Sequence, residues 1–337
     1  MVSVVIPVYN KAETIGPVLE AVYNSTYPNF EVVLVNDCST DNCMEVLRGF
    51  AGRYPHRLVA LKENMGVSKA RNIGSGKAAG EIILFIDADC IIMPETMARC
   101  VEKLSGSGAS CVGGAYTKDA WDEDFFSNFQ SLYIHYVETK NEHPDYIATH
   151  CMAIRKDLFQ EFGGFVENSF IGHQASVEDV EFSHRLIQAG HRLLRPASIQ
   201  VRHMFGFNFN RSIRNAVKKS KYWTMYSLKN RDVLKDSGAA SHQLKVNTGT
   251  QAFNLILVAA ALASGIWWLL LPIPLLYALN VGASFSLFQL IKRERGWWFL
   301  VRSLLYYQLV YPAAVAYGSA VGTLKYLWEV KILRRYG

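Results

Sequence analysis

The sequence predicts an α/β fold with a mostly parallel central sheet, followed by C-terminal transmembrane helices. Two observations support this prediction. Apolar runs rich in β-branched residues alternate with helix-like stretches through the first 200 residues, which is typical of repeated βα units. Residues 246–291 then carry no charged side chain. At about 1.5 Å per residue, a helix of that length would exceed twice the ~30 Å hydrocarbon core of a bilayer.

The apolar runs predict three strands, at Val2–Val8, Phe30–Val35 and Glu81–Ile86. Each strand ends in a short polar turn, at residues 7–10, 36–39 and 87–89. Ligands of open parallel sheets bind at the carboxyl ends of the strands, so these turns should border the functional site. Helices are expected at about 12–25, 41–53 and 67–79.

The middle of the chain contains less regular patterns. Residues 117–150 are aromatic and acidic, and we interpret them as a loop-and-helix insertion near the site. Residues 177–189 have the pattern of an amphipathic helix. Residues 211–229 predict a basic amphipathic helix that lies on an anionic membrane surface, the alternative being a solvated helix packed on the domain. We favour the membrane surface, because an apolar segment follows soon after.

The uncharged segment is divided near its middle by Pro272 and Pro274. Two antiparallel membrane spans, at about 252–271 and 274–291, would form a hairpin with a short external turn. The basic residues 292–295 then return to the cytosolic side, in agreement with the positive-inside rule.

A third apolar stretch, at about 303–323, contains Pro312 and the small residues Gly318 and Gly322. A simple third crossing would place the basic tail outside the cytosol, whereas a re-entrant segment would keep it inside, and the sequence leaves both open. The small residues allow close helix packing and make an oligomer possible. The expected organisation is an α/β domain at 1–210, an interfacial helix region at 211–245 and a membrane domain at 246–337.

Charge argues against a nucleic-acid binder. The chain has 35 Lys and Arg against 29 Asp and Glu, but residues from 251 onward hold 8 basic and 2 acidic residues, which leaves 27 of each sign before them. The excess therefore flanks apolar helices, as in membrane proteins. A strand-like run begins at Val2 without a basic leader, so we expect the catalytic domain on the cytosolic face. The six scattered cysteines are expected to be free thiols.

Several carboxylates stand where chemistry is expected. Asp87 and Asp89, one residue apart after a strand, can together hold one hard divalent cation that also binds a diphosphate. His203, at the end of a likely strand, is either structural or a third metal ligand. Asp37 can accept from a nucleobase or a ribose hydroxyl. Glu178 and its neighbour Asp179 begin a helix, where a carboxylate can act as general base or stabilise the helix N-terminus.

Five motifs occur in one order and resemble family 2 glycosyltransferases of the GT-A fold. They are Val4–Asn10, Val35–Asp41, Asn64–Asn72, Asp87–Asp89 and Glu178–Glu181. The resemblance covers about residues 1–205. Asn36 departs from the pair of aspartates that is usual in the second motif. The phosphate-binding patterns GxGxxG after the first strand and GxxxxGK[ST] are missing from the sequence, which disfavours dinucleotide oxidoreductases and P-loop NTPases.

The resemblance implies an inverting transfer that depends on Mg²⁺ or Mn²⁺. It implies that the nucleotide pocket is lined by Pro7, Tyr9, Glu13, Asp37, Arg71 and Asp87. Asp89 and His203, with Asp87, would hold the metal. Asp179 would be the general base beside Glu178, and Thr149 and His150 would contact the donor sugar.

The expected function is the transfer of one sugar from a nucleotide-sugar, with UDP-sugars favoured, to a lipid-linked acceptor at the membrane. A phosphate acceptor needs little base catalysis, whereas a hydroxyl acceptor needs Asp179. Two alternatives remain. A processive polysaccharide synthase is disfavoured because the Gln-x-x-Arg-Trp motif is missing from the sequence. A non-catalytic membrane scaffold is disfavoured because both carboxylate motifs are intact.

Overall fold

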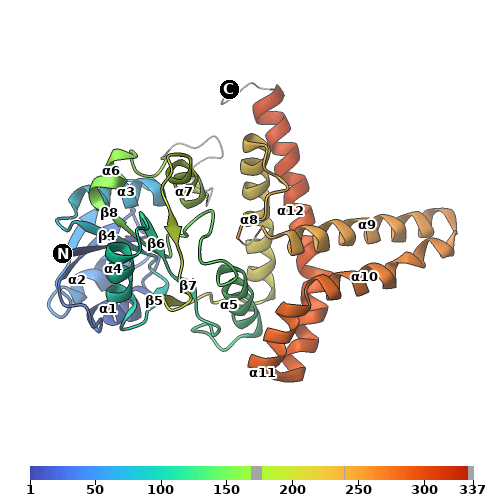
Figure 1. The fold of residues 1–337 in the computed structure, drawn as a ribbon, viewed down its shortest axis with the longest axis horizontal. Helices are drawn as coiled ribbons and strands as arrows, with labels where there is room; N and C mark the ends of the chain where they lie inside the picture. The colour runs from blue at the N-terminus through green and yellow to red at the C-terminus, as the bar shows by residue number, and fades with distance from the viewer. Residues whose placement is uncertain (168–176, 239, 333–337) are drawn as a thin grey trace. The chain divides into compact units, whose positions relative to one another are not determined.

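The computed structural model describes residues 1–167, 177–238 and 240–332, and it divides into two compact units (Figure 1). The N-terminal unit contains residues 1–123 and 137–206. The C-terminal unit contains residues 124–136 and the chain from residue 207 onward. The predicted catalytic domain, 1–210, therefore differs from the N-terminal unit mainly at residues 124–136. These residues include most of one helix and belong to the C-terminal unit.

The N-terminal unit is built on a seven-stranded sheet in the order β3-β2-β1-β4-β8-β6-β9. β1, β2, β3 and β4 are mutually parallel neighbours, whereas β8 runs antiparallel to β4 and β6. The strands are β1 (Val2–Val8), β2 (Phe30–Asn36), β3 (Arg57–Ala60), β4 (Ile82–Ile86), β6 (Cys111–Gly113), β8 (Cys151–Arg155) and β9 (Leu193–Leu194). The mostly parallel sheet was predicted, and its three central apolar strands lie where expected.

β3 was missed by the sequence interpretation, which took β4 as the third strand. This strand has only four residues at the sheet edge, and each is partly or fully exposed, so it has no buried apolar run. The helices of this unit are α1 (Ile15–Tyr23), α2 (Cys43–Phe50), α3 (Val67–Lys77), α4 (Thr96–Gly106), α6 (Lys156–Glu161) and α7 (Glu178–Gln188).

α3 packs very closely against the sheet. A Cβ atom at Gly74 would overlap the side chain of Val5 and lie 3.1 Å from that of Val35. Gly74 therefore allows the helix and the strands to approach each other, whereas a Cβ atom at Gly76 would meet nothing within 4 Å.

A second sheet of three strands brings distant segments to the site. Its order is β5 (Cys90–Ile92), β10 (Gln200–His203) and β7 (Ala115–Tyr116). β10 pairs antiparallel with β5, and the register places His203 opposite Cys90. The histidine thereby comes next to the turn that follows β4.

The C-terminal unit is helical. It holds most of α5 (Phe125–Glu138), then α8 (Phe209–Asn230), α9 (His242–Ser264), η1 (Trp267–Leu270), α10 (Pro272–Ala283), α11 (Phe285–Leu305), η2 (Tyr306–Val310), α12 (Tyr311–Tyr326) and η3 (Leu327–Ile332). By length and apolar composition, the segments His242–Ser264 and Phe285–Glu329 could each cross a membrane, and Trp267–Ala283 is a shorter apolar helix.

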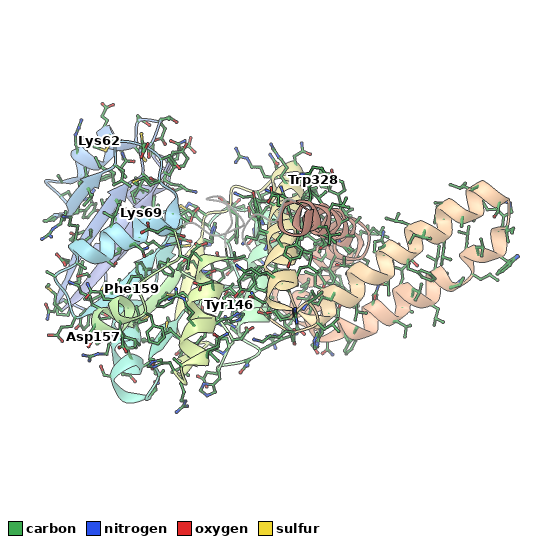
Figure 2. All side chains as sticks on the ribbon, turned by 90° about the horizontal axis from the view of Figure 1, so that it is seen from above. Lys62, Lys69, Tyr146, Asp157, Phe159 and Trp328 are labelled. Carbon is green, nitrogen blue, oxygen red and sulfur yellow. The ribbon has the colours of Figure 1, made fainter. Side chains whose placement is uncertain are left out.

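α9 and α10 form an antiparallel hairpin, as predicted for this region (Figures 1 and 2). The predicted boundaries were wrong, because the first helix ends at Ser264 rather than 271 and the second runs over Pro272–Ala283 rather than 274–291. Gly265, at φ 71°, terminates α9 in the left-handed conformation that favours glycine. Pro272 instead begins α10, where its missing N–H has no helical partner to lose.

α12 lies against α8 through its small residues. A Cβ atom at Gly318 would lie 2.5 Å from the carbonyl oxygen of Val217, and one at Gly322 would overlap the backbone of Lys221. The two glycines therefore pack within the chain rather than presenting a free face for pairing between chains. The predicted third apolar stretch, 303–323, lies in the helical segment Phe285–Glu329, which is kinked at Gly296, where φ is 77°.

We predict that Gly318→Ala destabilises the C-terminal unit by roughly 1–3 kcal/mol, because the added methyl overpacks the α8–α12 contact. Gly249→Ala is the matched control, since its Cβ would meet nothing within 4 Å, and it should be neutral or stabilising by up to ~1 kcal/mol. Thermal unfolding in one detergent measures both. Equal melting temperatures for the two variants would contradict the close packing.

Candidate functional site

The polar turns at the carboxyl edge of the sheet are connected by hydrogen bonds. The side-chain oxygen of Asn10 accepts from the backbone N–H of Thr40 at 2.8 Å, which joins the turns after β1 and β2. The hydroxyl of Thr14 donates to the carbonyl of Ala88 at 2.7 Å, which joins the start of α1 to the Asp87–Asp89 turn. The three turns predicted to border the site therefore form one hydrogen-bonded rim.

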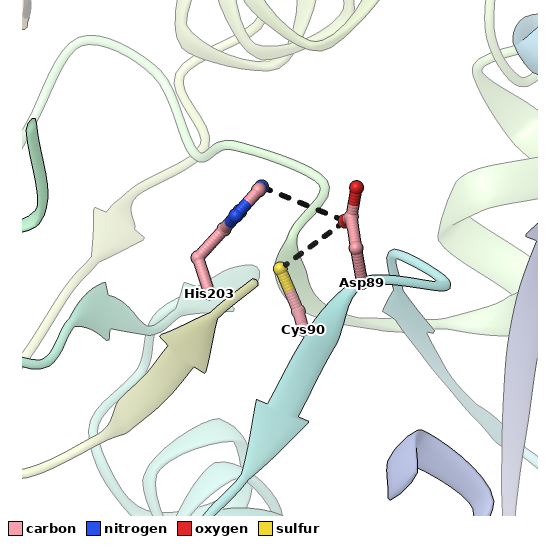
Figure 3. Close-up of side chains that lie close together, drawn as sticks. All are labelled: Asp89, Cys90 and His203. Carbon is pink, nitrogen blue, oxygen red and sulfur yellow. Dashed lines mark hydrogen bonds and ion pairs between the residues drawn. The ribbon is translucent and has the colours of Figure 1, made fainter. Parts of the chain in front are cut away.

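Asp89 is the centre of a cluster of charged and polar groups. One carboxylate oxygen, Oδ2, lies 2.6 Å from the ammonium of Lys11. The other, Oδ1, lies 3.5 Å from Nε2 of His203 and 3.8 Å from the thiol of Cys90 (Figure 3). The predicted partners Asp89 and His203 are thus brought together, although 114 positions separate them in the sequence.

The electrostatics of this cluster favour a carboxylate and a protonated thiol. Burial opposes ionisation of Asp89, but the electrostatic effects of His203 and Lys11 outweigh it and hold the pKa of that carboxyl below its usual range. Burial and the neighbouring charges of Asp89 and Asp87 raise the pKa of the Cys90 thiol well above its usual range. Cys90 is therefore a weak donor to Asp89 rather than a thiolate ligand.

These residues fit a divalent cation. The ligand atoms of Asp89, Cys90 and His203 all lie within 4.8 Å of one another. A carboxylate oxygen suits Mn²⁺ or Mg²⁺, and the imidazole nitrogen favours a transition metal such as Mn²⁺ over Mg²⁺. The ammonium of Lys11 shows that a cation is favoured at the Asp89 carboxylate. Asp87 directs one oxygen to Arg71 and is not among the three residues whose ligand atoms converge, so its predicted part in the metal site stays a prediction.

Arg71 is buried between two carboxylates. Its guanidinium donates to Asp87 at 2.6 Å and to Glu178 at 2.6 Å. Burial alone would lower the pKa of Arg71, but the two carboxylates outweigh that effect and raise it. The cation therefore links the turn after β4 to the first residue of α7, and its predicted contact with a nucleotide stays a prediction.

Asp179 has the environment of a proton acceptor near neutral pH. Burial and the charge of the adjacent Glu178 raise the pKa of Asp179 to about 7. Oδ1 of Asp179 accepts from the backbone N–H of Val180 at 2.8 Å. Glu178, by contrast, has its charge compensated by Arg71, so the two neighbouring carboxylates have different environments.

Asp37 organises the loop before α3. Its two carboxylate oxygens accept from the backbone N–H groups of Met65 at 2.7 Å and Gly66 at 2.9 Å. Each carboxylate oxygen of Asp37 can accept a further hydrogen bond, so its predicted contact with a nucleotide stays a prediction. Tyr9 and Glu13 are exposed near the same edge, and Pro7 is half-buried in β1.

Thr149 and His150 are both buried. Nε2 of His150 lies 3.0 Å from the carbonyl oxygen of Gly114, and its ring packs 4.2 Å from that of Tyr116. Tyr116 also contacts the ring of His203, at 5.2 Å between centroids. His150 is thus one aromatic ring away from the Asp89 cluster, and its predicted sugar contact is not tested by this geometry.

The sequence interpretation missed Lys11 and the aromatic residues that hold His203. The His203 ring stacks on Phe205 at 3.9 Å and meets Tyr116 edge-on. Lys11 directly follows the predicted turn 7–10, so its charge beside a site turn was a usable signal. Tyr116 and Phe205 had no such signal, because only the pairing of β10 with β5 and β7 brings them together.

Comparisons with known proteins agree with this arrangement. Residues 3–163 match the family model described as glycosyl transferase family 2. The chain is 31% identical over 199 residues to the glycosyltransferase AglE of Haloferax volcanii, which covers 57% of this chain and 63% of the relative. It is 37% identical to the uncharacterized glycosyltransferase YibD of Escherichia coli over 27% of each chain. The matches therefore span less than two thirds of either relative's length.

One solved structure resembles nearly the whole chain. The mannosyltransferase PcManGT from Pyrobaculum calidifontis, in complex with GDP-Man and Mn²⁺, has a TM-score of 0.60 over 97% of this chain and 87% of its own. Sequence identity is 20%, so the likeness concerns the fold. Together with the sheet order, it confirms the predicted α/β fold of the GT-A type.

We predict that Arg71→Met destabilises the protein by roughly 3–5 kcal/mol, because it leaves the buried carboxylate of Glu178 without its cation. Arg155→Met removes an exposed pair with Asp157, which solvent screens, and should change the stability little. Chemical denaturation measures both.

The double variant Arg71→Met/Glu178→Gln should recover part of the loss, since the uncompensated charge is then absent. An Arg71→Met protein as stable as Arg155→Met would show that the guanidinium is not a structural requirement.

Proposed function

Because the chain belongs to glycosyl transferase family 2 through residues 3–163, we propose that it transfers one sugar from a nucleotide-sugar to a lipid-linked acceptor at a membrane, with inversion at the sugar carbon. The observation that carries the proposal is the convergence of Asp89, His203 and Lys11 at the carboxyl edge of the sheet, with Asp179 in the same unit. A departing diphosphate needs positive charge to stabilise it, and an acceptor hydroxyl needs a base to take its proton.

Asp89 and His203, with Asp87, would hold Mg²⁺ or Mn²⁺. When bound, the metal stabilises negative charge on the departing diphosphate as a Lewis acid. The chain supplies the rest. His203 is kept against Asp89 by its stacking on Phe205, so the donor set is preorganised. Asp87 is held by Arg71 through one oxygen, and its other oxygen would be the one to bind metal or ribose.

The nucleoside would lie over the turns after β1 and β2. Tyr9 is exposed there and can stack on a base. Asp37 fixes the backbone of Met65 and Gly66, which shapes the neighbouring loop. UDP-sugars are favoured from the family resemblance. GDP-sugars are the second choice, since the solved relative in fold was determined with GDP-Man.

Asp179 would remove the proton from an acceptor hydroxyl. Its raised pKa makes it a stronger base than an ordinary carboxylate while leaving it largely ionised slightly above neutrality. Direct attack of the activated oxygen on the sugar carbon, opposite the diphosphate, inverts that centre. Glu178 holds α7 in place through Arg71 and does not need to exchange a proton.

A membrane position for the C-terminal unit is supported by the surface of the α9–α10 hairpin. Apolar side chains project from both helices (Figure 2), and the most exposed include Ile256, Leu262, Trp268, Leu271 and Leu275. Amide side chains are buried instead, with Asn280 donating to Asn247 at 3.1 Å. Large apolar side chains on the outside and polar side chains on the inside are the arrangement that a bilayer favours.

Tryptophans and basic residues give the proposed topology. Trp267 and Trp268 lie in the uncharged turn of the hairpin. Trp297 and Trp298 follow residues 292–295, of which three are basic and one is acidic. Indole rings favour membrane interfaces and basic residues favour the cytosolic side. The proposal is therefore a multi-pass protein with its catalytic unit on the cytosolic face, where a lipid-borne acceptor would be presented.

The function is tested by nucleotide release from the purified full chain in native lipids with UDP-, GDP- and dTDP-sugars, each with Mn²⁺ and with EDTA. We expect metal-dependent release from one donor, and one added sugar on a lipid product. Asp89→Asn should abolish the metal-dependent part while the melting temperature changes little. Release by Asp89→Asn at the wild-type rate would contradict the metal assignment, and a long polymer would indicate a processive enzyme.

The pH dependence follows from Asp179. The base must be ionised, so the rate with a hydroxyl acceptor should fall about tenfold per pH unit below pH 7 and level off above it. Asp179→Asn should lower the rate on the order of 10²-fold or more and remove this dependence.

The pH dependence of folding stability gives an independent control on the pKa of Asp179. A carboxyl whose pKa is raised in the folded state loses stability as pH rises from about 4 through 7, so wild type should show this loss and Asp179→Asn should not. A variant that loses donor binding as much as turnover would show that Asp179 is not the base.

A further inference from the structure

The ammonium of Lys11 lies on the carboxylate that the proposed function assigns to the metal. Nζ of Lys11 is 2.6 Å from Oδ2 of Asp89, and the two side chains are 36% and 16% exposed. We propose that Lys11 is a displaceable counterion of Asp89, which weakens metal binding alone and makes it depend on a nucleoside diphosphate. This inference rests on the proposed function and deepens it.

The backbone of Lys11 is fixed, whereas its head group has room to move. The N–H of Lys11 donates to the sulfur of Cys43 at 3.2 Å, and its carbonyl accepts from the N–H groups of Thr14 and Ile15 at 3.1 and 3.0 Å. Thr14 in turn donates to Ala88 in the turn that carries Asp89. The flexible four-carbon stem therefore starts from an anchored point beside the site, and its ammonium can leave Asp89 without moving the rim.

Both oxygens of Asp89 face positive or proton-bearing groups. Oδ2 contacts Lys11, while Oδ1 faces His203 and Cys90. A divalent cation that binds Asp89 must take an oxygen that the ammonium holds, and it must then tolerate a nearby positive charge. The other carboxylate of this turn, Asp87, is paired with Arg71 through one of its oxygens. The metal alone therefore competes with Lys11 for one carboxylate.

A diphosphate changes this competition. Its anionic oxygens would bind the metal and also offer the displaced ammonium new acceptors, and an ammonium has three donors to give. The metal and the nucleoside diphosphate should consequently bind with positive coupling, each raising the affinity of the other by the same factor. Lys11 then becomes a diphosphate-binding residue only when the metal is present.

The test measures Mn²⁺ affinity of the full-length protein in detergent by electron paramagnetic resonance, with and without UDP or GDP. The association of Mn²⁺ with the free nucleotide is measured separately and subtracted. In wild type we expect the nucleotide to raise Mn²⁺ affinity about tenfold or more. In Lys11→Met we expect tighter Mn²⁺ binding without nucleotide, by about fivefold or more, and a correspondingly smaller gain on adding nucleotide.

Two control variants separate the local contact from general charge and from misfolding. Lys11→Arg keeps the positive charge and should retain most of the coupling. Lys62→Met removes one exposed lysine from the same unit and should bind Mn²⁺ as wild type does. The melting temperature of each variant is recorded, and a coupling restored by Lys11→Arg shows that the site itself is intact.

The outcomes distinguish the two levels of the proposal. Wild type that binds no Mn²⁺ with either nucleotide overturns the proposed function and this inference together. Wild type with clear coupling, but with Lys11→Met equal to it in both measurements, overturns only the role of Lys11. A Lys11→Met protein that binds Mn²⁺ more weakly without nucleotide would also overturn it, because Lys11 would then support the metal instead of competing with it.

Discussion

The buried guanidinium of Arg71 is the interaction on which the arrangement of the catalytic unit depends. It comes from α3 and holds Asp87, after β4, and Glu178, at the start of α7. A buried cation is stable only if carboxylates compensate it, so the three segments must meet in this geometry or lose several kcal/mol. The proposed donor side, at Asp87 and Asp89, and the proposed acceptor side, at Asp179, are thereby positioned by one charged group.

Two carboxylates of this unit, Asp89 and Asp179, have pKa values shifted in opposite directions. Lys11 and His203 lower the pKa of Asp89, whereas for Asp179 burial and the charge of Glu178 outweigh the opposing charge of Arg71 and raise the pKa to about 7. An ionised ligand for a cation and a base poised near neutrality are both needed for the proposed transfer. Environment, rather than residue type, thus separates the two roles.

The C-terminal unit follows a different physical rule. Its α9–α10 hairpin exposes large apolar side chains and buries amides, among them Asn247 and Asn280. Two hairpin helices in water would gain by the opposite arrangement, because apolar area would be removed from solvent. The close contact of α12 with α8 through Gly318 and Gly322 adds helix packing by small residues, which is common where lipid surrounds a bundle.

The sequence by itself determined the parallel strands, the polar turns and the long uncharged segment, because these are local patterns of residue type. Val2–Val8 is apolar on both faces and the Asp87–Asp89 turn follows an apolar run, so strand and site edge could be predicted together. Only the tertiary structure decided which strands pair and which distant side chains contact one another. The edge strand Arg57–Ala60 has no local pattern, and the pairing of Lys11 with Asp89 joins residues 78 positions apart. Such contacts are chosen by strand register and by the compensation of buried charge, which no short stretch of sequence contains.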